Sequence, residues 1–210
     1  MRKHRVAAGV GAVGATFVLL ASGCSTTGTE AEDDHGSHDH ETTSQAAGAS
    51  DTHNDADASF ARDMIPHHEQ AVVMSDLILA KQGIDPRVFE LAKQIKAAQA
   101  PEIETMRGWL TQWGTPQAPS GHEGHDMSGD TSMQMGMMTE QQLEALRQAQ
   151  GVDASRQFLT GMIAHHEGAV RMAQTEIDSG QSEPAVHLAH DIVETQQREI
   201  DTMKQILGTL

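Results

Sequence analysis

Two stretches of this chain carry the same set of side chains that can bind metal. Residues 60–74 read FARDMIPHHEQAVVM, and residues 158–172 read FLTGMIAHHEGAVRM. The stretches are offset by 98 residues and share the pattern Met-Ile-x-His-His-Glu-x-Ala-Val-x-Met. A pattern that recurs in this way indicates a repeated structural unit. Both copies keep two histidines and two methionines, whose imidazole and thioether groups are ligands for borderline and soft metal ions.

An α-helix would bring these four side chains to one face. With about 100° per residue, they fall within an arc of about 120°, the width of a stripe that faces a protein core. Glu69 points away from this arc and is expected to be a solvated surface acid. The predicted ligands are Met64, His67, His68 and Met74 in the first copy and Met162, His165, His166 and Met172 in the second.

A second pair of stretches supplies a carboxylate and a further methionine. Glu102 and Met106 lie one turn apart on an apolar stripe, and Glu199 and Met203 repeat this arrangement at an offset of 97 residues. A carboxylate on a core face has to be paired, protonated or bound to a metal. We therefore expect each glutamate to complete a metal site, or to accept a hydrogen bond from an imidazole and fix its tautomer.

Methionine and histidine are also concentrated in residues 115–138, which read as a loop. This loop has little reason to pack, yet it uses the same ligand types as the repeated stretches. We predict that it captures the metal ion or passes it on. The residues concerned are His122, His125, Met127, Met133, Met135, Met137 and Met138.

The donor set favours copper. Imidazole and thioether groups without a thiolate suit Cu(I) best, with Cu(II) and Ag(I) as further candidates. Structural zinc usually takes cysteine or more histidine, and hard cations prefer clustered carboxylates. Methionine at helical spacing is also ordinary core filling, so a purely structural role is the competing interpretation. The pattern leaves open whether the two copies form two sites or one shared site.

Helices are the elements that must position these residues. The first is expected to be capped by Asp57 or Ser59, to be kinked or to leave a carbonyl unpaired at Pro66, and to end near residues 81–83. The second starts at Asp85-Pro86 and ends by residue 114. A short helix follows at 139–147, where Thr139 and Gln142 fit a capping box.

The repeat therefore comprises a whole helical hairpin. The first hairpin spans residues 57–114 and the second spans 139–210, and the loop 115–138 joins them. The chain contains no strand-length run of β-branched residues. Two hairpins that bury their apolar faces against each other predict an all-α four-helix bundle.

The N-terminal residues predict export. Residues 1–23 combine a basic start with a short apolar run, as a signal peptide does. They end at Cys24, the only cysteine, and small residues before a lone cysteine resemble a bacterial lipobox. We predict a lipid on Cys24 and a place on the extracytoplasmic face of the cell membrane, with a secreted or periplasmic protein as the alternative.

Residues 24–56 are expected to form a disordered tether, because they are polar and acidic without apolar periodicity. Histidines in this tether can collect metal loosely; they are His35, His38, His40 and His53. Removal of residues 1–23 changes the formal net charge from −16 to −19. Such a charge argues against nucleic acid as a partner, since phosphate binding needs a basic surface.

The repeated segments resemble the DUF305 family. The resemblance rests on Met64–Ala71 and Met162–Ala169, on the Leu-Ala, Ile, Gln, Glu-Ile and Met positions that follow each, and on residues 135–139. It extends over about residues 57–210. It implies a ferritin-like helical bundle in an exported bacterial protein. Some members, the CopM-like proteins, are associated with copper binding and resistance.

The leading hypothesis is a lipid-anchored, non-enzymatic protein that sequesters Cu(I) or exchanges it with a donor or acceptor protein in copper homeostasis. One alternative is a ferritin-like metal-dependent oxidase or peroxidase, but such centres use more inward carboxylates than the one glutamate per hairpin found here. The other is a metal-free helical module that binds a partner through its methionine-rich loop. The sequence contains no nucleophile triad, phosphate loop or dinucleotide motif.

Overall fold

The structure, a computed structural model, describes residues 52–115 and 135–210. These ranges form five helices and no strand, so the expected all-helical fold is confirmed. The helices are α1 (Asp55–Leu79), α2 (Pro86–Gln112), α4 (Glu140–Gln148), α5 (Gly151–Ser179) and α6 (Glu183–Leu207). The predictions for Cys24, for the signal peptide, for most of the tether and for His122, His125, Met127 and Met133 fall outside the described residues.

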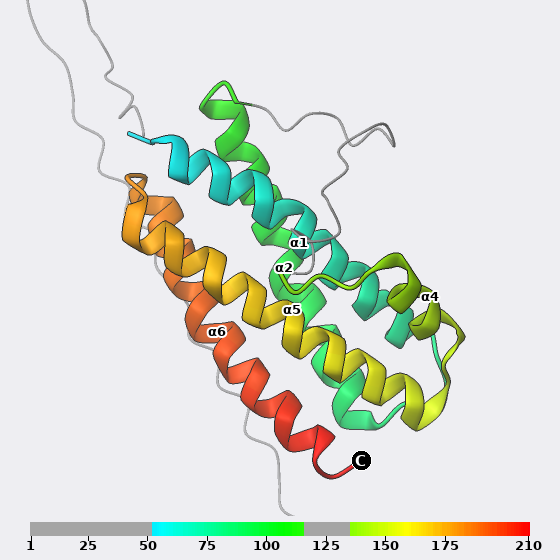
Figure 1. Cartoon of the computed structure of the whole chain (residues 1–210). Helices are drawn as coiled ribbons and strands as arrows, with labels where there is room; N and C mark the ends of the chain where they lie inside the picture. The colour runs from blue at the N-terminus through cyan, green and yellow to red at the C-terminus, as the bar shows by residue number, and fades with distance from the viewer. Residues whose placement is uncertain (1–51, 116–134) are drawn as a thin grey trace, which may run out of the picture. The chain divides into compact units, whose positions relative to one another are not determined.

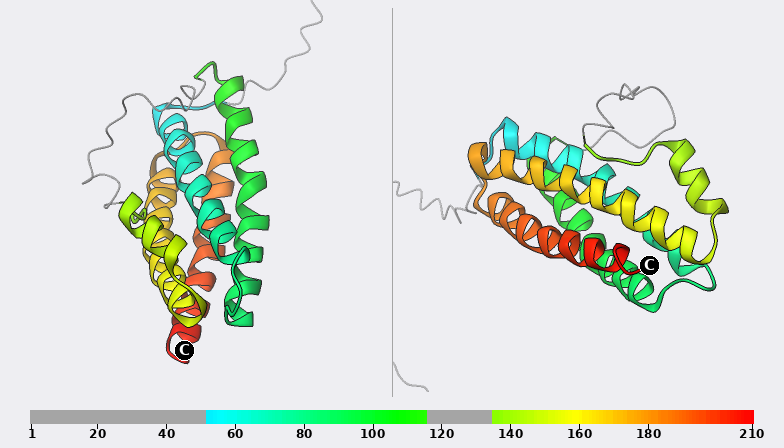
Figure 2. Two further views of the ribbon diagram at one scale, coloured as in Figure 1. Left: turned by 90° about the vertical axis from the view of Figure 1, so that its right-hand side faces the viewer. Right: turned by 60° about the horizontal axis from the view of Figure 1, so that its bottom comes forward.

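Four long helices lie side by side, and α4 lies across one end of α5 (Figures 1 and 2). Helix α1 packs mainly on α2, and α5 packs mainly on α6. The two pairs meet where α1 runs antiparallel to α5. At one end the Asn54 side chain donates to the carbonyl of Ser179 over 2.8 Å, and at the other end Gly83 lies against Gly151. None of the described helices is both long and apolar enough to cross a membrane.

Helix α1 begins earlier than the sequence suggests. The prediction that Asp57 or Ser59 caps it is wrong, because Asn54 is the cap and accepts from the amides of Ala56 and Asp57. The Asp57 side chain instead accepts a hydrogen bond from the Asn54 amide, which completes a capping box. The helix runs through Pro66 as one element and ends at Leu79, before the predicted residues 81–83. Gly83 takes the turn that follows, with a φ of 72°.

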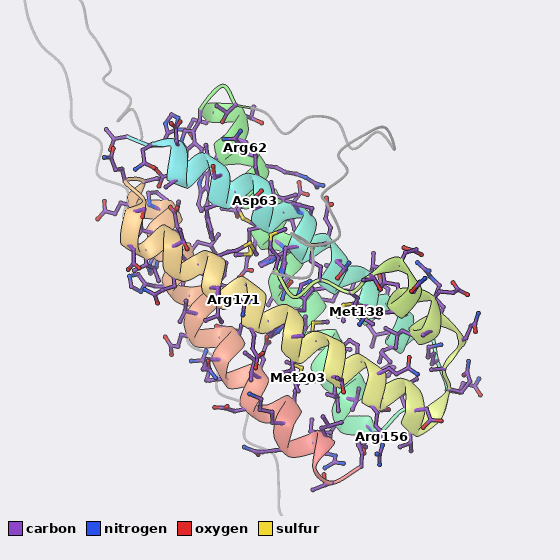
Figure 3. The ribbon with its side chains drawn as sticks, in the orientation of Figure 1. Arg62, Asp63, Met138, Arg156, Arg171 and Met203 are labelled. Carbon is purple, nitrogen blue, oxygen red and sulfur yellow. The ribbon has the colours of Figure 1, made fainter. Side chains whose placement is uncertain are left out.

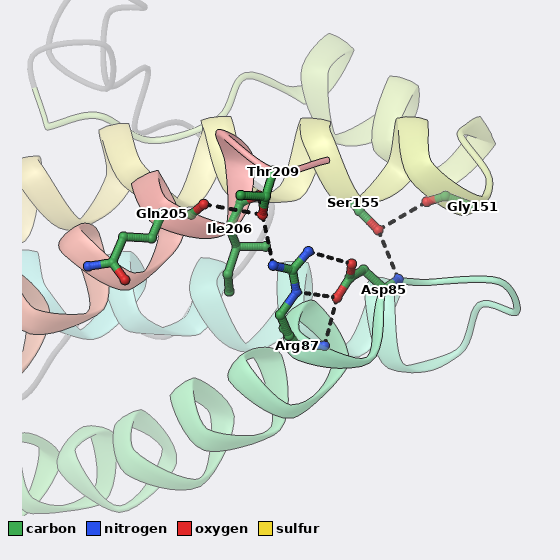
Figure 4. Close-up of polar contacts among 7 residues, drawn as sticks. All are labelled: Asp85, Arg87, Gly151, Ser155, Gln205, Ile206 and Thr209. Carbon is green, nitrogen blue, oxygen red and sulfur yellow. Dashed lines mark hydrogen bonds and ion pairs between the residues drawn. The ribbon is translucent and has the colours of Figure 1, made fainter.

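The other predicted helix starts are confirmed. Asp85 caps α2 and Pro86 follows it, while Thr139 and Gln142 form the capping box of α4. The start of α2 also joins three chain segments (Figure 4). Arg87 donates to the hydroxyl of Thr209 over 2.8 Å, and the hydroxyl of Ser155 accepts from the Asp85 amide over 3.4 Å. These bonds hold α2 to the start of α5 and to the end of the chain.

The opposite end of the bundle is closed by a buried carboxyl pair. Asp57, with 0% exposure, accepts from the backbone amides of Gln181 and Ser182 over 3.0 and 2.8 Å. Burial alone raises the pKa of Asp57, but its hydrogen bonds with Glu176 and these backbone amides outweigh burial, so the pKa lies below its ordinary value. Glu176 is 1% exposed. Burial and the neighbouring Asp57 carboxylate raise the pKa of Glu176 to about 8, so Glu176 is mostly protonated at pH 7.

The substitution Glu176→Gln is expected to flatten the pH dependence of stability. Glu176 keeps its proton up to about pH 8 in the folded chain and loses it near 4.5 when unfolded. Stability is therefore lost as the pH rises through this window, by up to about 1.4 kcal/mol per pH unit. Denaturant unfolding between pH 5 and 8 measures this slope. The exposed Asp178 on the same helix supplies the control, Asp178→Asn. Equal slopes in Glu176→Gln and the parent would contradict the raised pKa of Glu176.

Candidate metal centre

A polar layer divides the core into two apolar clusters. One cluster holds residues 60–65 of α1 and 169–173 of α5, and the other holds residues 71–78 of α1 and 154–162 of α5. The histidine pairs of both helices lie between these segments, and His67, His68, His165 and His166 are all 0% exposed. Because α1 and α5 are antiparallel, the two pairs lie at the same level of the bundle. The sequence repeat therefore places all four histidines in one layer.

The histidines of the two copies are in contact. The ring centroids of His67 and His165 are 3.7 Å apart, and the ring planes are tilted by 35°. His166 lies behind His165, with 6.2 Å between ring centroids. The first histidine of each copy therefore meets its counterpart in the other copy. The imidazoles form a single cluster where α1 crosses α5.

Glu102 and Glu199 orient two of the imidazoles from the outer helices. His68 Nε2 and His166 Nε2 each lie 2.7 Å from a carboxylate oxygen, of Glu102 and Glu199 respectively. An ionised carboxylate only accepts hydrogen bonds, so Nε2 carries the proton and Nδ1 keeps its lone pair. Both glutamates are partly exposed, with 25% and 15% of their side chains accessible. They lie at the edge of the core, where the cost of burying their charge is small.

His67 and His165 differ, although they occupy matched positions. His67 Nε2 lies 2.9 Å from the carbonyl oxygen of Met135, which accepts its proton. Neither ring nitrogen of His165 has a hydrogen-bond partner in the described part of the chain. The Nδ1 atoms of all four histidines are buried and without a partner. Buried nitrogens normally find a partner, so five orphaned ring nitrogens in one layer mark a site that can accept a ligand.

Burial favours the uncharged form of three of these imidazoles, those of His67, His165 and His166. It lowers the pKa of His67 to about 3, although the bond to Met135 opposes the shift. Burial and the neighbouring His67 hold the pKa of His165 well below its usual 6.5. Burial also lowers the pKa of His166, against the opposing bond from Glu199. A neutral imidazole is the form that binds metal, so no proton has to leave these rings at pH 7.

The methionines form two sets, one in each apolar cluster. Each set combines three repeat-matched positions drawn from both helix pairs, and sulfur atoms accordingly lie inside the bundle (Figure 3). The first set is Met64 and Met106, with the partly buried Met172 packed against them. The second set is Met74, Met162 and Met203, all 0% exposed.

This placement corrects one expected grouping. The sequence suggests that Met64 and Met74 join the same two histidines in one site. Ten residues of helix separate their Cα atoms by about 15 Å, and the two side chains lie in different clusters. The same holds for Met162 and Met172. The two methionines of each motif therefore lie on opposite sides of the polar layer.

The loop methionines also differ from expectation. The prediction that this loop has little reason to pack is wrong for Met138, which is 9% exposed and belongs to a core cluster. Met135 and Met137 are half-buried. Residues 135–138, which we call the strap, run over the junction of α1 and α5 just before α4 (Figure 1). The backbone of the strap, rather than its sulfur atoms, makes the contact with His67.

Two buried glutamines of the polar layer were not predicted as site residues. Gln99 and Gln196 occupy matched positions, one turn before Glu102 and Glu199, and each is 3% exposed. Both amide atoms of Gln99 and the oxygen of Gln196 have no hydrogen-bond partner among the described residues. Their match across the repeat, inside an otherwise apolar stripe, was the signal in the sequence. Glu69 and Glu167 lie outside and pair with Arg107 and Lys204, as expected for surface acids.

The histidines of the layer and the neighbouring carboxylates are not preassembled around a common point. Within residues 52–115 and 135–210, no three His, Cys, Asp or Glu side chains are placed to hold an ion together. The rings of His67 and His165 are in contact with each other, with 3.7 Å between their centroids. The donor atoms on offer are imidazole nitrogens and thioether sulfurs.

Comparison with known proteins identifies the family. The domain family of unknown function DUF305 matches residues 57–207. The chain belongs to the DUF305 family. A DUF305 fragment from Deinococcus radiodurans is 34% identical, with a TM-score of 0.65 over 75% of this chain and 98% of the other. A DUF305 protein from Streptomyces coelicolor, described as a candidate secreted protein, is 34% identical and has a TM-score of 0.65 over 73% and 91%.

The chain also resembles solved structures of CopM. CopM in its Cu(I)-bound form is 31% identical, with a TM-score of 0.59 over 73% of this chain and 96% of the other. CopM has also been solved in Cu(II)-bound and silver-bound forms. No protein with a curated description matches the chain.

The protonated nitrogen of each imidazole in the polar layer can be measured by NMR. We expect His67, His68 and His166 to carry their proton on Nε2 at pH 7, because an oxygen accepts from that atom in each case. His67 should not titrate between pH 5 and 8, since its pKa is about 3. Nitrogen-15 shifts of the imidazoles measure both properties. The exposed His187 and His190 serve as internal controls. Protonation of His67 near pH 6.5 would contradict the assignment.

Proposed function

We propose that this DUF305 protein binds copper, most favourably Cu(I), at the polar layer between its two helix pairs. The observation that carries the proposal is the set of four buried, repeat-matched histidines whose Nδ1 lone pairs have no partner. In three of the four rings, Nε2 donates a hydrogen bond to an oxygen of Glu102, Glu199 or Met135. Nδ1 of each of these rings therefore keeps a lone pair that can bind a metal ion. An ion that enters the layer would replace the missing partners.

The donor chemistry supports a soft ion. Imidazole nitrogens lie in the layer and thioether sulfurs lie on either side of it, without any thiolate in the described residues. The predicted donor residues therefore remain His67, His68, His165 and His166, with methionines from either set. Glu102 and Glu199 would orient the rings as outer-shell carboxylates rather than bind the ion. CopM, which is similar in sequence and fold, binds Cu(I), Cu(II) and silver.

The copper is best regarded as cargo rather than as a catalytic cofactor. A ferritin-like oxidase centre needs several inward carboxylates, and the two glutamates that reach the layer both point their oxygens at histidines. We propose that the protein stores the ion or exchanges it with a donor or acceptor protein, and that its ferritin-like bundle is a duplicated hairpin. Export through the signal peptide and a lipid on Cys24 would place this activity outside the cytoplasm.

Replacement of His67 and His165 by phenylalanine tests the proposal. His67→Phe/His165→Phe keeps two stacked rings in the core and removes their nitrogens. Anaerobic Cu(I) titration against a chromophoric chelator should then lose one bound equivalent. The double variant His187→Ala/His190→Ala removes two exposed histidines of α6 and should bind as the parent does. If both variants keep the stoichiometry and affinity of the parent, the polar layer is not the copper site.

A second test addresses the orienting glutamates. Glu102→Gln should weaken Cu(I) binding about 10–100-fold, the usual effect of losing an outer-shell carboxylate. The amide retains the size of the side chain but no longer fixes the proton on His68 Nε2. Glu104→Gln, two residues away on the exposed face of α2, is the matched control. Equal affinities of the two variants would contradict an orienting role for Glu102.

A further inference from the structure

The strap lies in a seat that only α5 provides. Three small residues of α5 face it, and a Cβ atom at Gly168 would lie 1.7 Å from the carbonyl oxygen of Met135. A Cβ at Gly161 would lie 2.8 Å from the sulfur of Met138. Gly136 of the strap has a φ of 73°, and a Cβ there would lie 2.0 Å from the carbonyl oxygen of Ala164. The backbones of the strap and of α5 thus touch without side chains between them.

Helix α1 supplies the clamp on the other side. The Gln70 amide donates to the carbonyl of Met138 over 2.9 Å, and its oxygen accepts from the Met138 amide over 2.7 Å. A glutamine side chain therefore pairs with the strap as a neighbouring strand would. The third fixed point is the bond between His67 and the carbonyl of Met135. Figure 3 shows Met138 where the strap meets the bundle.

The seat and the clamp explain three of the six positions at which residues 60–74 and 158–172 differ. Asp63, Pro66 and Gln70 of the first copy correspond to Gly161, Ala164 and Gly168 of the second. A pure core or ligand role gives no reason for these exchanges, because all six positions lie outside the histidine and methionine pattern. These differences leave α5 with only small residues at the three positions and give α1 the long polar side chain of Gln70. Both changes favour a strap that crosses from one helix to the other.

The strap covers the centre of the polar layer. It contacts His67 through Met135, and its Gly136 lies against the backbone at residues 164–165. Beneath it, His67 and His165 are 0% exposed, and the strap is one of the segments that cover them. The strap is also the direct continuation of the segment that holds the other loop methionines.

We propose that the strap is a gate for the polar layer and that Gln70 is the positioning residue that holds it shut. This inference rests on the proposed copper function and concerns the rate at which the ion enters and leaves. Release of the two Gln70 bonds frees Met138 and lets the carbonyl of Met135 move away from His67. Exchange is then limited by the opening of the strap, whereas affinity is set by the imidazoles below it.

The test separates rate from affinity in the purified, full-length protein. Gln70→Ala should raise hydrogen exchange at the Met138 amide about tenfold, as expected for the loss of two hydrogen bonds. It should speed Cu(I) transfer to a chelator by a similar factor, with the equilibrium affinity unchanged within about twofold. Gln174→Ala, which removes an exposed glutamine from α5, is the matched control and should change neither rate.

Gly168→Ala approaches the same contact from the opposite side. Its methyl group displaces the carbonyl of Met135, so it should also speed transfer while leaving Gln70 in place. Transfer rates equal to the parent's in Gln70→Ala, in a protein whose Cu(I) binding depends on its histidines, would overturn the gate and leave the copper function standing. Absence of histidine-dependent Cu(I) binding in the parent would overturn both proposals.

Discussion

Burial of four imidazoles at one level of the bundle is the constraint on which the rest depends. An apolar core gains nothing from such rings, and each orphaned nitrogen is costly to keep from water. The layer persists because apolar clusters above and below hold the helices together. In three of the four rings, Nε2 also donates a hydrogen bond to an oxygen of Glu102, Glu199 or Met135. The Nδ1 lone pairs remain without a hydrogen-bond partner. These lone pairs are the groups of the layer that could bind a ligand.

The antiparallel crossing of α1 and α5 decides how the matched residues are combined. Repeat-equivalent histidines meet at the centre, since they lie midway along their helices. Methionines ahead of the histidines on one helix instead meet those behind the histidines on the other, which yields two mixed sets. The arrangement keeps soft sulfur ligands on both sides of the nitrogen cluster. Each helix pair contributes two histidines to the layer between the two halves.

Much of this was readable from the sequence, because helical periodicity fixes which residues share a face. The helix types, the inward histidines and the outward Glu69 follow from that rule alone. The grouping of Met64 with Met172 rather than with Met162 does not follow, since it requires the direction in which α1 crosses α5. The cap at Asn54 was missed because Asp57 is also a good cap, and only the backbone decides between them. The strap was out of reach, because glycines at 136, 161 and 168 acquire meaning only when two distant segments touch.

The difference between Gln70 and Gly168 has a consequence for how the halves of this protein can associate. Two copies of the α1–α2 pair placed face to face would present two clamps and no smooth helix for a strap to lie on. Two copies of the α5–α6 pair would present two seats and nothing to grip the strap. Only the unlike pairing offers both a clamp and a smooth helix to one strap, and this is the pairing found in the chain. The two hairpins are related by the sequence repeat, but they are no longer interchangeable.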